Sequence, residues 1–518
     1  MIVYSRNYFT FAPQNFKSKS KMKKIYVKEW MSFQPYGRQD EIDTYYVKVA
    51  NRLADFLKTA LGERYSEHSL HGIAIYLTLW FQDLTTQTGV WEAFTGECRK
   101  RYGHPVPFMT SEEEEEYYPG EVNPEDMRFL LWHYFQSLEK QAGGVLNPEN
   151  PVFEDLAYQL YDYLSDEYEV APENTRLHDM LYGEPFGEND YMRYRSLLEW
   201  FHFCSYVGFE NRSEYQHAVE AAVRMGNANP SLLSYDVKQN ILFEGRKNLL
   251  SLTSVEWLAL VGKTHPEAAQ WAEVKVVPQG MYLYEGEDET SLFVKDLSGE
   301  EEVQLSVRKD SVNMDSLKGR KEGMTVLQSR WVQYGGTWWQ DGTLVVSDYE
   351  EKMKEELVRQ AAKREDIRQT YDAFMKASGG KQFVFCQSEE EVRDFLFQKM
   401  EYKEKEGIQM PKMDAQHGLV LMVSSHTGIH IQMRLCECIS SPENKFYDSK
   451  EAQKKAILFL LNPEVIPYDL SCALQDAGML PDAGLNSLQG EKQGRELVKK
   501  HARFLTDYFF GKCREKDC

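Results

Sequence analysis

The chain has 518 residues and a formal net charge of −21 at pH 7. A chain of this length is expected to hold roughly two to four domains, and its apolar fraction of 42% is ample for packed cores. An acidic surface repels phosphate backbones, which argues against binding of duplex nucleic acid by the whole molecule. No run approaches the ~18 uninterrupted apolar residues of a transmembrane helix, and residues 1–21 lack the apolar segment of a secretory signal. We therefore expect a cytoplasmic protein that does not enter a membrane.

Residues 1–24 are predicted to be a disordered extension, with Met22 as the natural start, because a more protein-like segment opens at Met22. The eight cysteines are scattered without paired spacings, so we expect free thiols in a reducing compartment and not a disulfide framework.

Residues 25–265 are predicted to form an all-helical domain. Ile25–Trp30 could begin it as a short strand. Asp40–Leu61 has apolar residues at helical spacing, and Gly62 follows its end. Five consecutive glutamates, Glu112–Glu116, are typical of a solvated loop. The other helices are expected over Leu70–Leu84, from Pro124 onward, and over Phe153–Tyr168, Asp190–Val207, Arg212–Met225, Val237–Leu250 and Ser254–Val261.

Residues 266–347 are predicted to form a small β-sheet or barrel domain, because apolar and aromatic residues crowd short runs between turn signals. Gly335-Gly336 and Asp341-Gly342 are of the kind that makes tight hairpin turns. The aromatic residues around these turns have two interpretations. They could form a binding face for a peptide or a base, or the core and rim of the domain, and we favour the second because aromatic residues are enriched in strands for packing alone. The candidates for the binding face are Trp331, Trp338 and Trp339.

Residues 348–378 are predicted to be one long connecting helix, for which a coiled-coil partner site is the alternative. Residues 379–518 mix strand and helix patterns and are predicted to be an α+β module. Cys436 and Cys438 lie in an apolar pattern that we interpret as a strand. No second pair with zinc-ligand spacing follows them, so two buried thiols are expected and no metal site.

Ionisable residues set among apolar helices are the remaining candidates for chemistry. Glu199-x-x-His202 places both side chains on one helix face, and in di-iron bundles such a pair appears twice. A converging site would draw on Asp83, Asp126, His133, Glu199 and His202. Buried acids are costly unless they are paired or liganded, so such a cluster would be a distinctive feature of the fold. No motif for a nucleotide or metal cofactor is found, and we expect no cofactor.

Six stretches carry a resemblance. They are KIYVKEW from Lys24, LWFQDLTTQTGVWEAF at Leu79–Phe94, EVNPEDMRFLLWHYF at Glu121–Phe135, DEYEVAPEN at Asp166–Asn174, SPENKFYDSKEA at Ser441–Ala452 and MLPDAGLNS at Met479–Ser487. The chain thereby resembles a domain-of-unknown-function family of uncharacterised bacterial proteins common in gut bacteria. The resemblance implies no known activity, substrate or cofactor, so it assigns no site residue.

Three functions stay open from the sequence. The first is a cytoplasmic, non-enzymatic interaction or regulatory protein with an unidentified protein partner, because no complete catalytic constellation is visible. The second is a hydrolase or metal-assisted enzyme with its site in the helical domain. The third is a protein that binds single-stranded nucleic acid through the Trp-rich hairpin.

Overall fold

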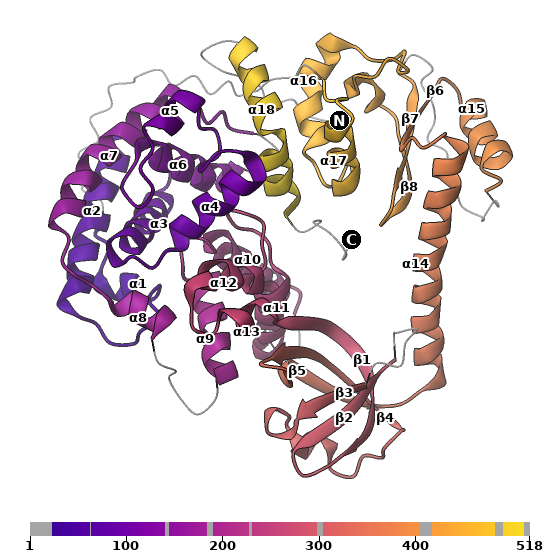
Figure 1. Ribbon diagram of the computed structural model, residues 1–518, viewed down its shortest axis with the longest axis horizontal. Helices are drawn as coiled ribbons and strands as arrows, with labels where there is room; N and C mark the ends of the chain where they lie inside the picture. Colours follow the sequence, from indigo (N-terminus) through magenta and orange to yellow (C-terminus); the bar gives the residue numbers. More distant parts are fainter. Residues whose placement is uncertain are drawn as a thin grey trace. The chain divides into compact units, whose positions relative to one another are not determined.

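The computed structural model describes residues 23–62, 64–139, 145–183, 190–226, 230–297, 304–402, 417–481 and 491–511 (Figure 1). Nearly all of the predicted extension, residues 1–24, therefore lies outside the described residues. The described chain divides into two compact units, one up to Gly183 and one after it. This division differs from the boundary expected near residue 265, which stays a prediction.

The first unit is helical throughout its described part. Its longest helix, α2, begins at Asp40, whose side chain takes part in a capping box with Asp43, and it ends at Gly62, where φ is +60°. The helix α3 is buried on most of its circumference, as its apolar sequence predicts. The helices of this unit are α1 (Val27–Met31), α2 (Glu41–Leu61), α3 (Glu67–Thr86), α4 (Val90–Tyr102), α5 (Ser111–Glu115), α6 (Pro124–Glu139), α7 (Pro151–Val170) and α8 (Arg176–Tyr182).

Two local predictions in this unit are wrong. Most of the expected strand Ile25–Trp30 lies in the helix α1 instead, where Trp30 is fully buried and donates its indole N–H to Asp43 at 3.1 Å. The expected loop Glu112–Glu116 is the short helix α5. Thr110 and Glu113 form a capping box at its start, which offsets the repulsion within the acidic run.

The second unit opens with helices that precede the barrel in sequence. They are α9 (Asp190–Phe203), α10 (Phe209–Arg224), α11 (Pro230–Glu244), α12 (Ser254–Val261), the 3₁₀ turn η2 (Gly262–Thr264) and α13 (Ala268–Ala272). The barrel strands are β1 (Lys275–Glu287), β2 (Ser291–Asp296), β3 (Gln304–Arg308), β4 (Thr325–Tyr334) and β5 (Thr337–Asp348), with the 3₁₀ turns η3 (Lys309–Ser311) and η4 (Met314–Leu317) between β3 and β4.

The barrel is closed in the order β1-β2-β3-β5-β4, with all pairs antiparallel except β3 with β5. Gly335 and Gly336 have φ of +58° and +76° and form the predicted hairpin turn between β4 and β5. The turn predicted at Asp341-Gly342 is wrong. These residues lie inside β5 at a shift of register, where a bulge turns Asp341 towards the helices.

The C-terminal module follows the long helix α14 (Glu351–Ala377), as predicted. It contains β6 (Phe383–Cys386), α15 (Glu389–Arg393), the π-helical turn η5 (Asp394–Lys399), β7 (Leu419–Ser424), β8 (Gly428–Gln432), η6 (Cys436–Cys438), α16 (Ser449–Leu460), α17 (Tyr468–Asp476) and α18 (Glu491–Phe510). The antiparallel sheet has the order β6-β7-β8. The strand expected around Cys436 and Cys438 is a 3₁₀ turn instead, and both thiols are buried, as expected.

Both faces of this sheet are covered. Alternate residues of β7 divide between two cores, with Val420 and Met422 packed among residues of α16, α17 and α18, and Leu421 packed with residues of α14 and α15. Figure 1 shows α14 and α15 on one side of the sheet and α16 and α17 on the other. The predicted class, a helical N-terminal region, a small barrel and an α+β tail, is thus confirmed. Among the described residues, none of the helices combines the length and the apolarity needed to cross a bilayer.

Candidate functional site

Three of the five ionisable candidates lie in the first unit, and each contacts residues outside the candidate set. Asp83 accepts the backbone N–H groups of Val90 and Trp91 at 3.2 and 2.7 Å, which fixes the start of α4. The Nδ1 atom of His133 lies 3.1 Å from the Tyr76 hydroxyl. These two side chains are therefore explained by capping and by packing among aromatic rings.

Asp126 is the third candidate and is fully buried. Its carboxyl accepts from the Tyr117 hydroxyl at 3.1 Å, and the amide of Asn123 lies 3.4 Å away. Burial raises the pKa of Asp126 to about 8, although these hydrogen bonds oppose the shift. Asp126 therefore carries a proton at neutral pH in the folded state.

Glu199 and His202 lie in the second unit, and their polar contacts are with different partners. Glu199 forms ion pairs with Arg195 and Lys238, at the side of α9 that faces the barrel. His202 is 2% exposed, and burial lowers its pKa to about 3, so the ring is neutral. Its Nδ1 atom lies 3.5 Å from the amide of Asn211. Glu199 and His202 thus have separate polar contacts although they share one helix, and the other three candidates belong to the first unit.

The three tryptophans of the hairpin region are engaged in packing. Trp331 is fully buried in the barrel core, and Trp338 packs against that core. Trp339 is 6% exposed and stacks on Tyr191 of α9 with ring centroids 5.0 Å apart. The guanidinium of Arg308 lies over the ring of Trp339, 4.4 Å from its centroid. These contacts agree with the packing interpretation of the aromatic residues.

A polar seam joins α9 and α11 to β4 and β5. Asp341, which the bulge in β5 exposes to the helices, accepts from the Tyr191 hydroxyl at 2.5 Å and from Arg195 Nε at 2.9 Å. Arg330 reaches Asn240 and Glu244 on α11. These polar contacts hold the helices against the barrel. Glu199 lies beside Arg195 because it pairs with this residue of the same interface.

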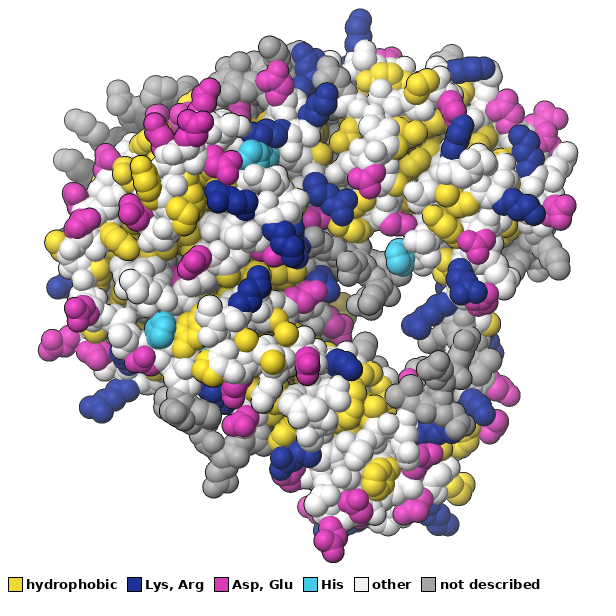
Figure 2. All heavy atoms as spheres, viewed as in Figure 1, with side chains coloured by type: hydrophobic (Ala, Val, Ile, Leu, Met, Phe, Trp, Pro, Cys, Tyr) yellow, Lys and Arg dark blue, Asp and Glu magenta, His cyan; other side chains and the backbone are white. Residues whose placement is uncertain are grey.

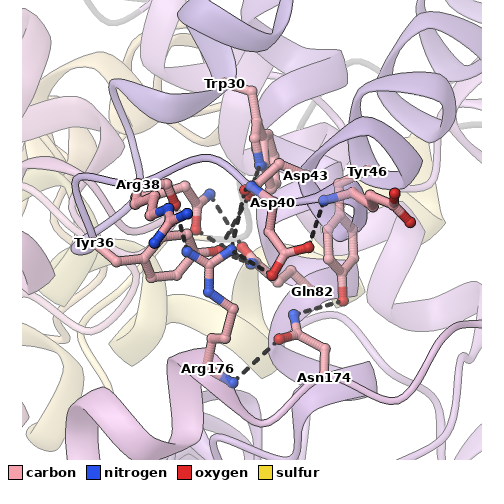
Figure 3. A network of polar contacts seen from close by, with 11 residues as sticks. Trp30, Tyr36, Arg38, Asp40, Asp43, Tyr46, Gln82, Asn174 and Arg176 are labelled. Atoms are coloured by element: carbon pink, nitrogen blue, oxygen red, sulfur yellow. Dashed lines mark hydrogen bonds and ion pairs between the residues drawn. The ribbon is translucent and has the colours of Figure 1, made fainter.

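Asp43 is a carboxyl group of the first unit with several polar contacts, and it was not among the predicted site residues (Figure 3). It is fully buried and accepts from Trp30 Nε1, the Tyr36 hydroxyl and Arg176 Nη1 at 3.1, 3.3 and 3.1 Å. The backbone N–H of Asp40 donates a fourth hydrogen bond at 2.8 Å. Four donors occupy the acceptor positions of this carboxyl group, so the network ties α1, α2 and the start of α8 together and leaves little capacity for a ligand.

The C-terminal module contains a cavity of about 600 Å³, lined by Gln382, Ser425, Tyr468, Asp469, Cys472, Ala473, Asp476, Ala477 and Arg503. We call it the C-terminal cavity. Five of these residues lie on α17, and the others come from the approach to β6, the turn after β7, α18 and the residue following α17. Asp469, Cys472, Ala473 and Asp476 follow the spacing of one helix face, which explains why one helix supplies much of the lining.

Charged groups on two helices face the C-terminal cavity. Arg503 Nη2 donates to the Tyr468 hydroxyl at 3.3 Å, and that hydroxyl donates to Asp507 at 2.7 Å. Asp469 accepts the backbone N–H of Ser425 at 3.1 Å. Burial raises the pKa of the Cys472 thiol, although Arg503 opposes the shift, so the sulfur is protonated and a weak nucleophile at neutral pH. Such a lining is suited to holding a ligand by charge and hydrogen bonds.

Sequence reasoning missed the C-terminal cavity. The sequence holds a local signal within α17, because Asp469 and Asp476 are seven residues apart, which places them on one face of a helix. The contribution of Arg503 could not be read in this way, since it comes from another helix. Within the described residues, no group of three or more His, Cys, Asp or Glu side chains converges as a metal site would require.

These features define a mainly helical multidomain protein with a closed five-stranded barrel and a C-terminal α+β module that carries a charged cavity. The chain belongs to the family described as "Protein of unknown function (DUF3843)", whose model matches residues 24–327 and 328–511. The comparison with curated proteins finds no match, and neither does the comparison with solved structures.

Proposed function

We propose that the protein is a non-enzymatic interaction or regulatory protein of the bacterial cytoplasm that holds its ligand in the C-terminal cavity. The observation that carries this proposal is the cavity itself. Its volume of about 600 Å³ is within the range of ~300–1,000 Å³ typical of ligand sites. Asp476 and Arg503 line it and remain exposed, so their charges are available to a ligand.

The chemistry of the lining favours binding over catalysis. The raised pKa of Cys472 keeps its thiol neutral, and Asp469 is held by the backbone of Ser425. Figure 2 shows acidic and basic side chains interspersed on the visible face, which fits recognition by a local arrangement of charges better than attraction by one large patch.

A hydrolase is the second candidate, because Asp126 holds a proton at neutral pH and could in principle act as an acid. It is less well supported, since that carboxyl is fully buried and engaged with Tyr117. Binding of single-stranded nucleic acid through the hairpin has the least support of the three functions, because the rings of Trp331 and Trp339 are already packed against other side chains.

The test is a thermal-shift screen of the full chain against a library of small metabolites and short peptides, followed by mass spectrometry of the incubated compounds. We expect compounds that raise the melting temperature and are recovered unchanged. Ala473→Trp places a large ring in the cavity and should abolish the shift. Lys454→Trp, on the exposed side of α16, is the matched control and should leave it intact. Conversion of a hit compound by the wild-type chain, or equal shifts with Ala473→Trp, would overturn the proposal.

A further inference from the structure

The C-terminal cavity is lined by charges of both signs. These charges indicate the chemical class of the ligand, which the proposed function does not name. Asp469 and Asp476 line it from α17, and Arg503 lines it from α18. A helix stripe with the spacing of Asp469, Cys472, Ala473 and Asp476 is usually apolar, because it usually faces a core. Here the two ends of the stripe are carboxylates.

Arg503 has donor capacity beyond its contacts within the described chain. A guanidinium offers five N–H donors. Nη2 donates to Tyr468 at 3.3 Å, Nε lies 3.7 Å from Asp507, and the side chain is 47% exposed. A guanidinium with exposed N–H groups is the preferred partner of a carboxylate, which it can bind through two parallel hydrogen bonds.

The two aspartates have acceptor capacity of the same kind. The Oδ2 atom of Asp469 accepts one backbone N–H from Ser425, while an ionised carboxylate can accept about four hydrogen bonds. Asp476 is exposed on the last turn of α17. Both are placed to receive an ammonium group that enters the cavity.

We propose that the C-terminal cavity binds a small zwitterion, a free amino acid or a short peptide with free ends. Its carboxylate pairs with Arg503, and its ammonium group pairs with one of the two carboxylates of α17, Asp469 or Asp476. A simple anion would face two carboxylates, and a simple cation would face the guanidinium, so only a ligand with both charges satisfies the whole lining. This inference rests on the proposed function and names its ligand class.

Matched ligands that differ by one charge test it directly. Isothermal titration calorimetry of the full chain would compare dialanine, N-acetyl-dialanine, dialanine amide and free alanine. We expect dialanine or alanine to bind. Which of the two binds more tightly shows whether the natural ligand is a short peptide or a free amino acid. Each blocked dipeptide should bind about tenfold more weakly or worse, because each lacks one of the two ion pairs.

Variants assign each charge to its partner. Arg503→Gln should remove the preference for dialanine over its amide, and Arg503→Lys should restore part of it. Of Asp469→Asn and Asp476→Asn, the variant of the carboxylate that binds the ammonium group should remove the preference over the N-acetyl form, and the persistence of that preference in both would contradict the assignment. Arg393→Gln on α15 and Glu464→Gln are exposed charges outside the cavity lining and serve as controls.

Dialanine amide binding as tightly as dialanine would overturn the inference, as would the absence of binding by all four compounds. A non-zwitterionic compound that binds as tightly as the zwitterions or more tightly, and that Ala473→Trp excludes, would also overturn it while leaving the proposed function intact. Turnover of a bound compound would instead overturn the proposed function.

Discussion

Asp126 and His202 are buried ionisable groups whose pKa values are shifted by burial towards the neutral form. Asp126 keeps a proton because a buried carboxylate is costly, and its pKa is raised to about 8. Between an unfolded pKa of roughly 4 and this value, the folded chain binds a proton that the unfolded chain lacks. Its contribution to stability is therefore present at low pH and is lost as pH rises through this window.

Asp126→Asn should remove that dependence, because the amide is neutral at every pH. We expect the free energy of unfolding of the wild type to fall relative to the variant by up to about 1.4 kcal/mol per pH unit between pH 5 and pH 7. Chemical denaturation at pH 5, 6 and 7 measures this difference. Asp155→Asn, at an exposed position on α7, is the control, and its free energy of unfolding should depend on pH in the same way as that of the wild type. If the free energies of unfolding of Asp126→Asn and of the wild type changed with pH in the same way, Asp126 would be ionised in the folded protein.

At the scale of elements, the packing of α9 against the end of α11 depends on Gly245. A Cβ atom added there would lie 2.3 Å from the Ile241 carbonyl oxygen and 2.9 Å from His202 Nε2. The buried histidine of the Glu199-x-x-His202 motif thus fills the space that a side chain at residue 245 would need, which gives this histidine a packing role.

Gly245→Ala should destabilise the second unit by about 1–3 kcal/mol, because a backbone carbonyl and a buried ring must both shift. Gly96→Ala provides the contrast, since Gly96 is exposed within α4 and nothing lies within 4 Å of its added Cβ. That variant should stabilise the first unit by about 0.5–1 kcal/mol through helix propensity. Denaturant titration measures the change in the free energy of unfolding for both variants. An unchanged free energy of unfolding for Gly245→Ala would contradict the packing described.

At the scale of the whole molecule, the two compact units should respond to pH in opposite directions. In the first unit, the raised pKa values of Asp126 and Glu125 lower stability as pH rises. In the second unit, burial lowers the pKa values of His202 and His430, so stability is lost as pH falls below roughly 6.5, the unfolded value.

Scanning calorimetry between pH 5 and pH 8 should therefore show two transitions that move oppositely. Asp126→Asn identifies the transition of the first unit, and Gly245→Ala that of the second. We expect shifts of a few degrees, since about 1 kcal/mol moves the midpoint of a unit of this size by ~2–4 °C. A single transition, or two that move together, would show that the units do not unfold independently.

The sequence alone determined the local features, because caps, turns and periodicity act over a few residues. Asp40 and Gly62 delimit α2, Gly335-Gly336 turns β4 into β5, and the helical, barrel and α+β regions follow one another as the patterns predict. The tertiary structure decided what long-range contacts control. It buried Trp30 within the helix α1, where the sequence suggested a strand, and it joined Asp43 to Arg176 across 133 residues. It also brought Arg503 beside Asp476, because a cavity is formed by side chains from separate elements whose meeting no local pattern encodes.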